Sequence, residues 1–70
     1  MATVIAKYKF DTESEWQSTI ARIDREIGRP SGMEIYSTSS EYFLSVDDTC
    51  EKASLIGQIC RASGGSLYNY

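Results

Sequence analysis

The sequence predicts an α+β fold in which the order strand, helix, strand occurs twice. Apolar and polar residues alternate along the first ten positions, which is the period of a half-buried strand. Two later segments place apolar residues at helical spacing, and glycine follows each of them. Two further alternating runs lie between these helices. At 70 residues, we expect one domain over residues 1–70, which buries only ~60% of its unfolded surface and leaves little room for an enclosed site.

The first strand is predicted over residues 2–10. One face carries side chains suited to a core, namely Val4, Ala6, Tyr8 and Phe10. The opposite face carries Thr3, Ile5, Lys7 and Lys9.

The first helix should begin after Asp11 and Thr12, because Thr12 and Glu15 have the spacing of a capping box. Its apolar stripe follows a helical period and consists of Trp16, Ile20, Ile23 and Ile27. Gly28 then offers a left-handed stop and Pro30 prevents continuation.

Residues 33–38 and 41–46 alternate as strands and are joined across Ser39 and Ser40, which predicts a hairpin. Asp48 and Glu51 repeat the capping-box spacing, so the second helix is expected to start there. The apolar face of that helix comprises Ala53, Ile56, Ile59 and Cys60. Gly57 favours close packing of this helix on the sheet, and the helix should end at residues 63–65. Residues 66–70 form a final edge strand.

These elements predict a ferredoxin-like split β-α-β arrangement (βαββαβ), because crossovers between parallel strands are right-handed and a hairpin joins the two halves. The first and third strands become central in a four-stranded antiparallel sheet, and both helices cover one face. The residues expected to point toward the helices are Val4, Ala6, Tyr8, Ile35, Leu44, Val46 and Leu67.

The opposite face of the sheet is predicted to be open. The alternation places on it Ile5, Lys7, Tyr36, Phe43 and Tyr68. Such an apolar and aromatic patch is larger than a monomer usually leaves in water. We expect another protein or a second copy of the chain to cover it, with Ile5, Tyr36 and Phe43 as anchors and with Lys7 and Glu34 setting the register.

Other functions are compatible with the same residues. The open face resembles the base-stacking surface of RNA-recognition domains, but residues 41–46 lack their basic and glycine-containing signature and the net charge is −3. Alternatively, the apolar residues are scattered and have no role. A small-molecule-sensing regulatory domain would bind a metabolite at a subunit interface, near residues 11–12 or 47–49. After a protein-interaction module and a ligand sensor, the third alternative is an enzyme that uses only Tyr, Lys and carboxylate side chains.

The composition argues against several kinds of chemistry. The chain has no histidine, so a Ser-His or Cys-His mechanism within one chain is excluded. We expect no catalytic residues, no cofactor and no metal, because Asp47 and Asp48 offer too few ligands. Cys50, in the first turn of the second helix, could form a reactive thiolate or be inert. Cys50 and Cys60 lie too far apart on one helix to pair, which suits a reducing, cytoplasmic setting.

One pattern in the C-terminal half has a known parallel. Residues 42–46, followed by a helix that ends in Gly64 and Gly65, are similar in pattern to the small linker domain that caps phycobilisome rods. The helix that contains Trp16 has no counterpart there, and the net charge differs from that of a linker. The resemblance is therefore confined to these residues.

Overall fold

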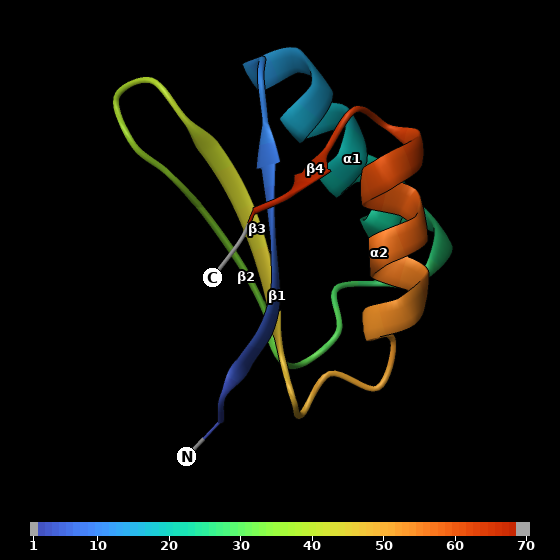
Figure 1. The fold of residues 1–70 in the computed structure, drawn as a ribbon. Helices are drawn as coiled ribbons and strands as arrows, with labels where there is room; N and C mark the ends of the chain where they lie inside the picture. The colour runs from blue at the N-terminus through green and yellow to red at the C-terminus, as the bar shows by residue number, and fades with distance from the viewer. Residues whose placement is uncertain (1, 69–70) are drawn as a thin grey trace.

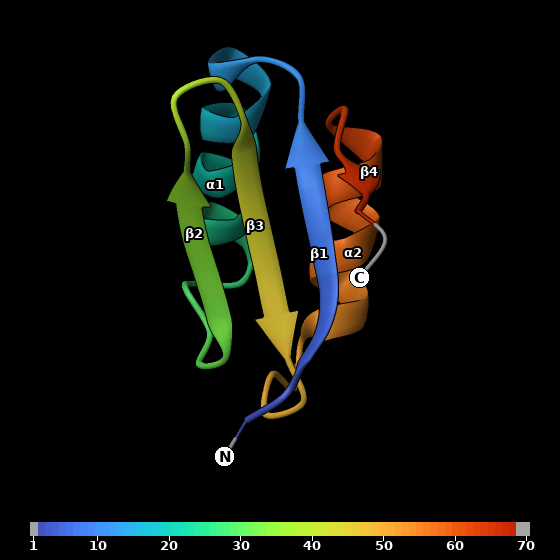
Figure 2. The ribbon, with the colours of Figure 1, turned by 60° about the vertical axis from the view of Figure 1, so that its left-hand side comes forward.

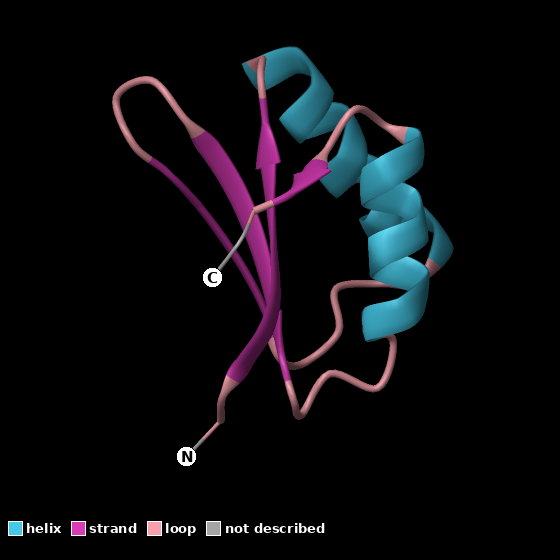
Figure 3. Cartoon of the chain, viewed as in Figure 1, coloured by secondary structure: helices cyan, strands magenta, loops and turns pink. Residues whose placement is uncertain are grey.

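The computed structural model describes residues 2–68 and has an α+β fold: an antiparallel sheet of four strands and two helices. The helices lie on the same side of the sheet, so that the molecule has two layers (Figure 1). The elements are β1 (Val4–Phe10), α1 (Glu13–Glu26), β2 (Met33–Ser37), β3 (Tyr42–Asp47), α2 (Ala53–Ala62) and β4 (Ser66–Leu67). Figure 3 shows the loops that join them.

The strand order in the sheet is β2-β3-β1-β4, with β1 and β3 in the centre as predicted. In Figure 2, α1 lies behind β2 and β3, and α2 lies behind β1 and β4. The hairpin of β2 and β3 keeps one register from Met33↔Val46 to Ser37↔Tyr42. The pairing of β1 with β3 shifts between Val4 and Ala6, which places a bulge at Ile5.

The first helix begins and ends as the sequence predicts. The Thr12 hydroxyl accepts a hydrogen bond from the Glu15 amide at 3.2 Å, which caps the helix as predicted. The Glu15 carboxylate returns to Thr12 as expected for this spacing, but it accepts from the Thr12 hydroxyl, at 3.0 Å. At the other end, Gly28 has φ +76° and its amide donates to the Ile23 carbonyl at 3.0 Å.

The predicted start of the second helix is wrong. Helix α2 begins at Ala53, and Lys52, the residue before it, makes no side-chain cap. The Asp47 carboxylate instead accepts hydrogen bonds from the amide and hydroxyl of Thr49, and Asp48 accepts one from the Thr3 amide. Aspartate favours local turns as readily as helix caps, and here Asp47 bonds within the turn between β3 and α2 while Asp48 bonds the backbone beside β1.

The core lies between the sheet and the helices. Its buried members are Tyr8, Phe10, Ile23, Leu44, Val46, Cys50, Ile56, Ile59 and Cys60. The predicted close approach at Gly57 is confirmed, because a Cβ atom there would lie 2.6 Å from the Tyr8 hydroxyl. Thr19 is also fully buried, and its hydroxyl donates to the Glu15 carbonyl at 2.7 Å.

The last strand is shorter than predicted. Strand β4 consists of Ser66–Leu67, and the rest of the predicted strand includes residues 69–70, which lie outside the described residues. Leu67 pairs with Tyr8 and therefore shares the face that the helices cover, as predicted, but at the edge of the sheet it remains 57% exposed. An edge strand of two residues leaves its outer side open to water. In the described part of the chain, no helix is both long and apolar enough to cross a membrane.

Candidate interaction site

The candidate site is the open face of the sheet, on the side away from the helices. Register places two cross-strand rows on it: Tyr36, Phe43 and Lys9 in one row, and Glu34, Ser45 and Lys7 in the next. Tyr68 joins the second row, because its amide donates to the Lys7 carbonyl at 2.6 Å. The structure therefore brings together on one face the predicted residues Lys7, Glu34, Tyr36, Phe43 and Tyr68.

Three aromatic rings on this face surround one ammonium group, and we name Tyr36, Phe43, Tyr68 and Lys7 the aromatic cluster. The Phe43 ring stacks on Tyr36 with centroids 5.3 Å apart and meets Tyr68 edge-on at 5.6 Å. The Lys7 Nζ atom lies 4.5 Å from the Phe43 centroid, 5.0 Å from that of Tyr68 and 5.3 Å from that of Tyr36. These distances are within the range of cation–π attraction.

The cluster covers its own central residue. Phe43 is only 5% exposed although neither helix lies on its side of the sheet. The expectation that Phe43 is an exposed anchor is therefore wrong, because Tyr36, Tyr68 and Lys7 pack around its ring. Ile5 at 57% and Tyr68 at 42% are exposed, and Tyr36 is half-buried.

Charged side chains surround the cluster. The Lys9 ammonium pairs with the Glu41 carboxylate at 3.0 Å, and its hydrogen bond to Glu41 raises the pKa of Lys9. Glu34 lies on the end strand β2, at the border of the cluster, and is exposed. The face thus has an apolar centre with charges at its border, which is the usual composition of a protein interface.

The two predicted ligand-binding segments lie elsewhere. The Thr12 side chain is engaged in capping α1, and those of Asp47 and Thr49 bond to each other. A depression of about 450 Å³ opens beside Thr49, and its other lining residues are Ile27, Pro30, Ser31, Glu51 and Lys52. The sequence predicts a candidate ligand site near Thr49, but it does not predict the residues that line the depression together with Thr49.

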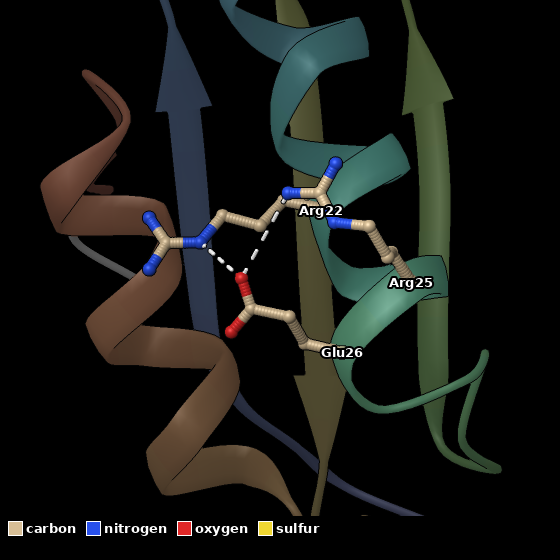
Figure 4. A network of polar contacts seen from close by, with 3 residues as sticks. All are labelled: Arg22, Arg25 and Glu26. Carbon is tan, nitrogen blue, oxygen red and sulfur yellow. Dashed lines mark hydrogen bonds and ion pairs between the residues drawn. The ribbon is translucent and has the colours of Figure 1, made fainter.

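A second depression, of about 310 Å³, separates the two helices on the outer surface, and sequence reasoning missed it. Leu55, 44% exposed, lines it together with Arg22 and Glu26. Arg22 bonds Glu26 at 2.7 Å and Arg25 approaches the same carboxylate at 4.0 Å (Figure 4). Exposed pairs of this kind contribute little to stability.

The cysteines offer little reactivity. Cys50 lies in the turn before α2, so its predicted position in the first turn of that helix is wrong, and the argument for a reactive thiolate, one of two alternatives, loses its basis. Both thiols are free and buried, and burial raises the pKa of Cys60 to about 12. A thiol with so high a pKa is a poor nucleophile at neutral pH. Within residues 2–68 no group of three or more acidic or thiol side chains is placed to bind a metal ion.

Comparison with family models, with curated proteins and with solved structures found no match to this chain.

Proposed function

We propose that this chain is a small, non-enzymatic, cytoplasmic module that acts by protein interaction, as a regulator or an inhibitor. It acts through the open face of the sheet, which binds a larger protein or a second copy of the chain. One observation carries the proposal: Tyr68, 42% exposed, packs against Phe43 on the side of the sheet that the two helices leave uncovered, and Ile5, 57% exposed, lies two residues before Lys7 in β1. Large apolar side chains grouped on one exposed face favour a protein partner.

The roles of the site residues follow from their exposure. Ile5, Tyr68 and the half-buried Tyr36 supply the apolar contact, and Phe43 supports them from beneath. Lys7 and Glu34 set the orientation of the partner through charge. Tyrosine suits this task because its rigid ring loses little entropy on binding and its hydroxyl can pair with polar groups.

We also propose that the fold is ferredoxin-like and that residues 1–70 form one domain. The strand order β2-β3-β1-β4, the antiparallel pairing and the position of the two helices on one side support the fold proposal. In that arrangement the two central strands carry Lys7 and Phe43 in the middle of the open face, which gives the site a rigid base.

Variants on the two surfaces test the proposal. Ile5→Glu and Tyr68→Glu each place a charge on the open face, and we expect either to lower partner affinity or self-association at least tenfold. Leu55→Glu is the matched control, because Leu55 is similarly exposed on the outer surface of α2. Sedimentation would measure mass, affinity capture would measure partner binding, and thermal melts would check the fold. Equal effects of Ile5→Glu and Leu55→Glu would reject the open face as the site.

A second candidate function is a small-molecule-sensing regulatory domain, and the depression beside Thr49 favours it. A ligand there would contact Thr49, Glu51 and Lys52, which provide hydroxyl, carboxylate and ammonium groups. A thermal-shift screen against common metabolites, repeated with Lys52→Ala, tests this candidate. A melting shift that Lys52→Ala abolishes would support it, and the absence of any shift would count against it.

A further inference from the structure

Strand β2 ends the sheet on one side, and its outer edge is regular. Within residues 2–68 the strand has one neighbour, β3, and Figure 2 shows its other side open. The register with β3 runs without a shift over all five residues, Met33–Ser37. Such an edge presents backbone donors and acceptors to any strand that can align with it.

The hydrogen bonds of the hairpin show which residues present these groups. The Thr38 amide donates to the Glu41 carbonyl at 2.8 Å, and the Asp47 amide donates to the Gly32 carbonyl at 2.9 Å. Even-numbered residues of this segment therefore bond toward β3. Because bonding directions alternate along a strand, the amides and carbonyls of the odd-numbered residues point outward; these are Met33, Ile35 and Ser37.

The opposite edge of the sheet is protected, whereas the β2 edge is not. On the far side, β1 has a bulge at Ile5, its middle is covered by the two-residue strand β4, and it carries Lys7 and Lys9. Short edge strands, bulges and lysines are the features that prevent edge pairing. The sequence of β2, Met-Glu-Ile-Tyr-Ser, contains no proline and no lysine.

We propose that the β2 edge pairs with the β2 edge of a second copy of the chain, antiparallel and centred on Ile35. In this register Ile35 faces Ile35 of the second copy, and Met33 faces Ser37. All three outward-pointing residues of each copy then exchange both of their backbone hydrogen bonds. A two-fold axis through the Ile35 pair makes the interface self-complementary, as in most homodimers.

Side chains select this register over its neighbours. Centred on Ile35, the pairing sets the Glu34 carboxylate opposite the Tyr36 hydroxyl of the other copy, where the phenol can donate a hydrogen bond. A pairing centred on Glu34 would oppose two carboxylates, which is destabilising. A pairing centred on Tyr36 would use fewer of the outward backbone groups, because Met33 would pass beyond the end of the partner strand.

The pairing would join the two open faces into one continuous surface. Glu34 and Tyr36 belong to both the edge and the candidate site, so this inference deepens the proposed function by naming a partner for part of that site. It remains separable from it, because Ile5 and Tyr68 take no part in edge pairing.

The first experiment removes one outward donor. Ser37→Pro deletes an amide that points away from β3 and adds a ring at the edge, while Ser37→Ala keeps the amide. By sedimentation we expect wild type and Ser37→Ala to have the mass of two chains, and Ser37→Pro to dissociate at least tenfold more readily with a similar melting temperature. Dimers of Ser37→Pro as stable as wild type, or a monomeric wild type at several hundred micromolar, would overturn the inference.

The second experiment reads the register and does not depend on the folding of the proline variant. Glu34→Cys and Tyr36→Cys chains are oxidised separately and then as a mixture, with the native thiols protected by burial. In the proposed register, position 34 of one copy and position 36 of the other form a non-hydrogen-bonded pair. The Cβ atoms of directly opposite residues in such a pair are close enough for a disulfide, whereas those of diagonal residues are not. A cross-link in the mixture alone supports the pairing centred on Ile35. A cross-link in the separately oxidised Glu34→Cys or Tyr36→Cys sample, or no cross-link in any of the three samples, rejects that register.

Comparison with Ile5→Glu separates the two proposals. A dimer lost in Ile5→Glu but kept in Ser37→Pro would reject the edge and support the face. A dimer lost in Ser37→Pro but kept in Ile5→Glu would support the edge and reject self-association through the face.

Discussion

The two faces of the sheet bury their side chains by different means. Toward the helices, Leu44 and Val46 are buried in one core with side chains of α1 and α2. On the other face, Phe43 reaches nearly the same burial without a covering helix, and Tyr36, Tyr68 and the Lys7 side chain pack against its ring. The first kind of cover is a complete layer, whereas the second is a thin one of flexible side chains. This difference teaches that a buried residue does not by itself mark a core.

Truncation of neighbouring residues should give the largest measurable difference between the faces. Leu44→Ala leaves a cavity between sheet and helices, and we expect a loss of about 3 kcal/mol in the free energy of unfolding. Phe43→Ala removes a larger side chain, but water can fill the space, so the expected loss is about 2 kcal/mol from the transfer term alone. Urea denaturation of the two variants measures both.

Leu55→Ala serves as the control for this comparison, because exposed truncations usually change stability by less than about 0.5 kcal/mol. If Phe43→Ala costs as much as Leu44→Ala or more, the open face is a second rigid core and the contrast between the faces disappears.

Alkaline titration should weaken the helix-covered face. Burial raises the pKa of Cys60 from an ordinary value of 9.0 to about 12, and it raises the pKa of Tyr8 as well. Both groups are neutral when protonated, so their contribution to stability is complete below the unfolded pKa and is lost as pH rises through the folded pKa. We expect the free energy of unfolding to fall between pH 9 and 12, measured by urea melts at stepped pH.

Cys60→Ala is the matched variant for the alkaline titration. Its stability should fall less steeply over the same interval, and the part that remains should include the contribution of Tyr8. Identical slopes for wild type and Cys60→Ala would show that the buried thiol does not titrate with unfolding.

The smallest expected effect concerns the thin cover of the open face. Lys7→Met keeps the apolar stem but removes the ammonium group near the three rings, and the loss should be about 0.5–1 kcal/mol. Urea melts at low and high salt would measure it. Lys9→Met, which breaks the exposed pair with Glu41, is the control for removing a charge from the same strand. A Lys7→Met variant as stable as wild type would show that the rings cover Phe43 without help from the cation.

Much of the fold could be predicted from local patterns. Thr12, Glu15 and Gly28 define α1 because capping depends on neighbouring residues, and the alternation of Tyr8 and Phe10 places β1 correctly. The start of α2 was mispredicted because aspartates cap helices and also close turns. Only the contacts of Asp48 with Thr3, 45 positions apart, decide between the two uses.

The sequence predicts which residues lie in the candidate site but not how exposed their side chains are. Alternation alone assigns Lys7, Tyr36 and Phe43 to one face. It does not give the direction in which long side chains bend, so the packing of Tyr68 and Lys7 around Phe43 could not be foreseen. The depression between the helices depends on how two distant segments pack, and no local pattern encodes it.

Tyr8 of β1 and Gly57 of α2 set the distance between the helix and the sheet at their point of contact. Because the Tyr8 hydroxyl occupies the space that a methyl group at Gly57 would need, the two positions form a single steric unit. Related sequences should change them together: phenylalanine at position 8 would admit alanine at position 57, whereas alanine paired with tyrosine would push the helix away from the strand.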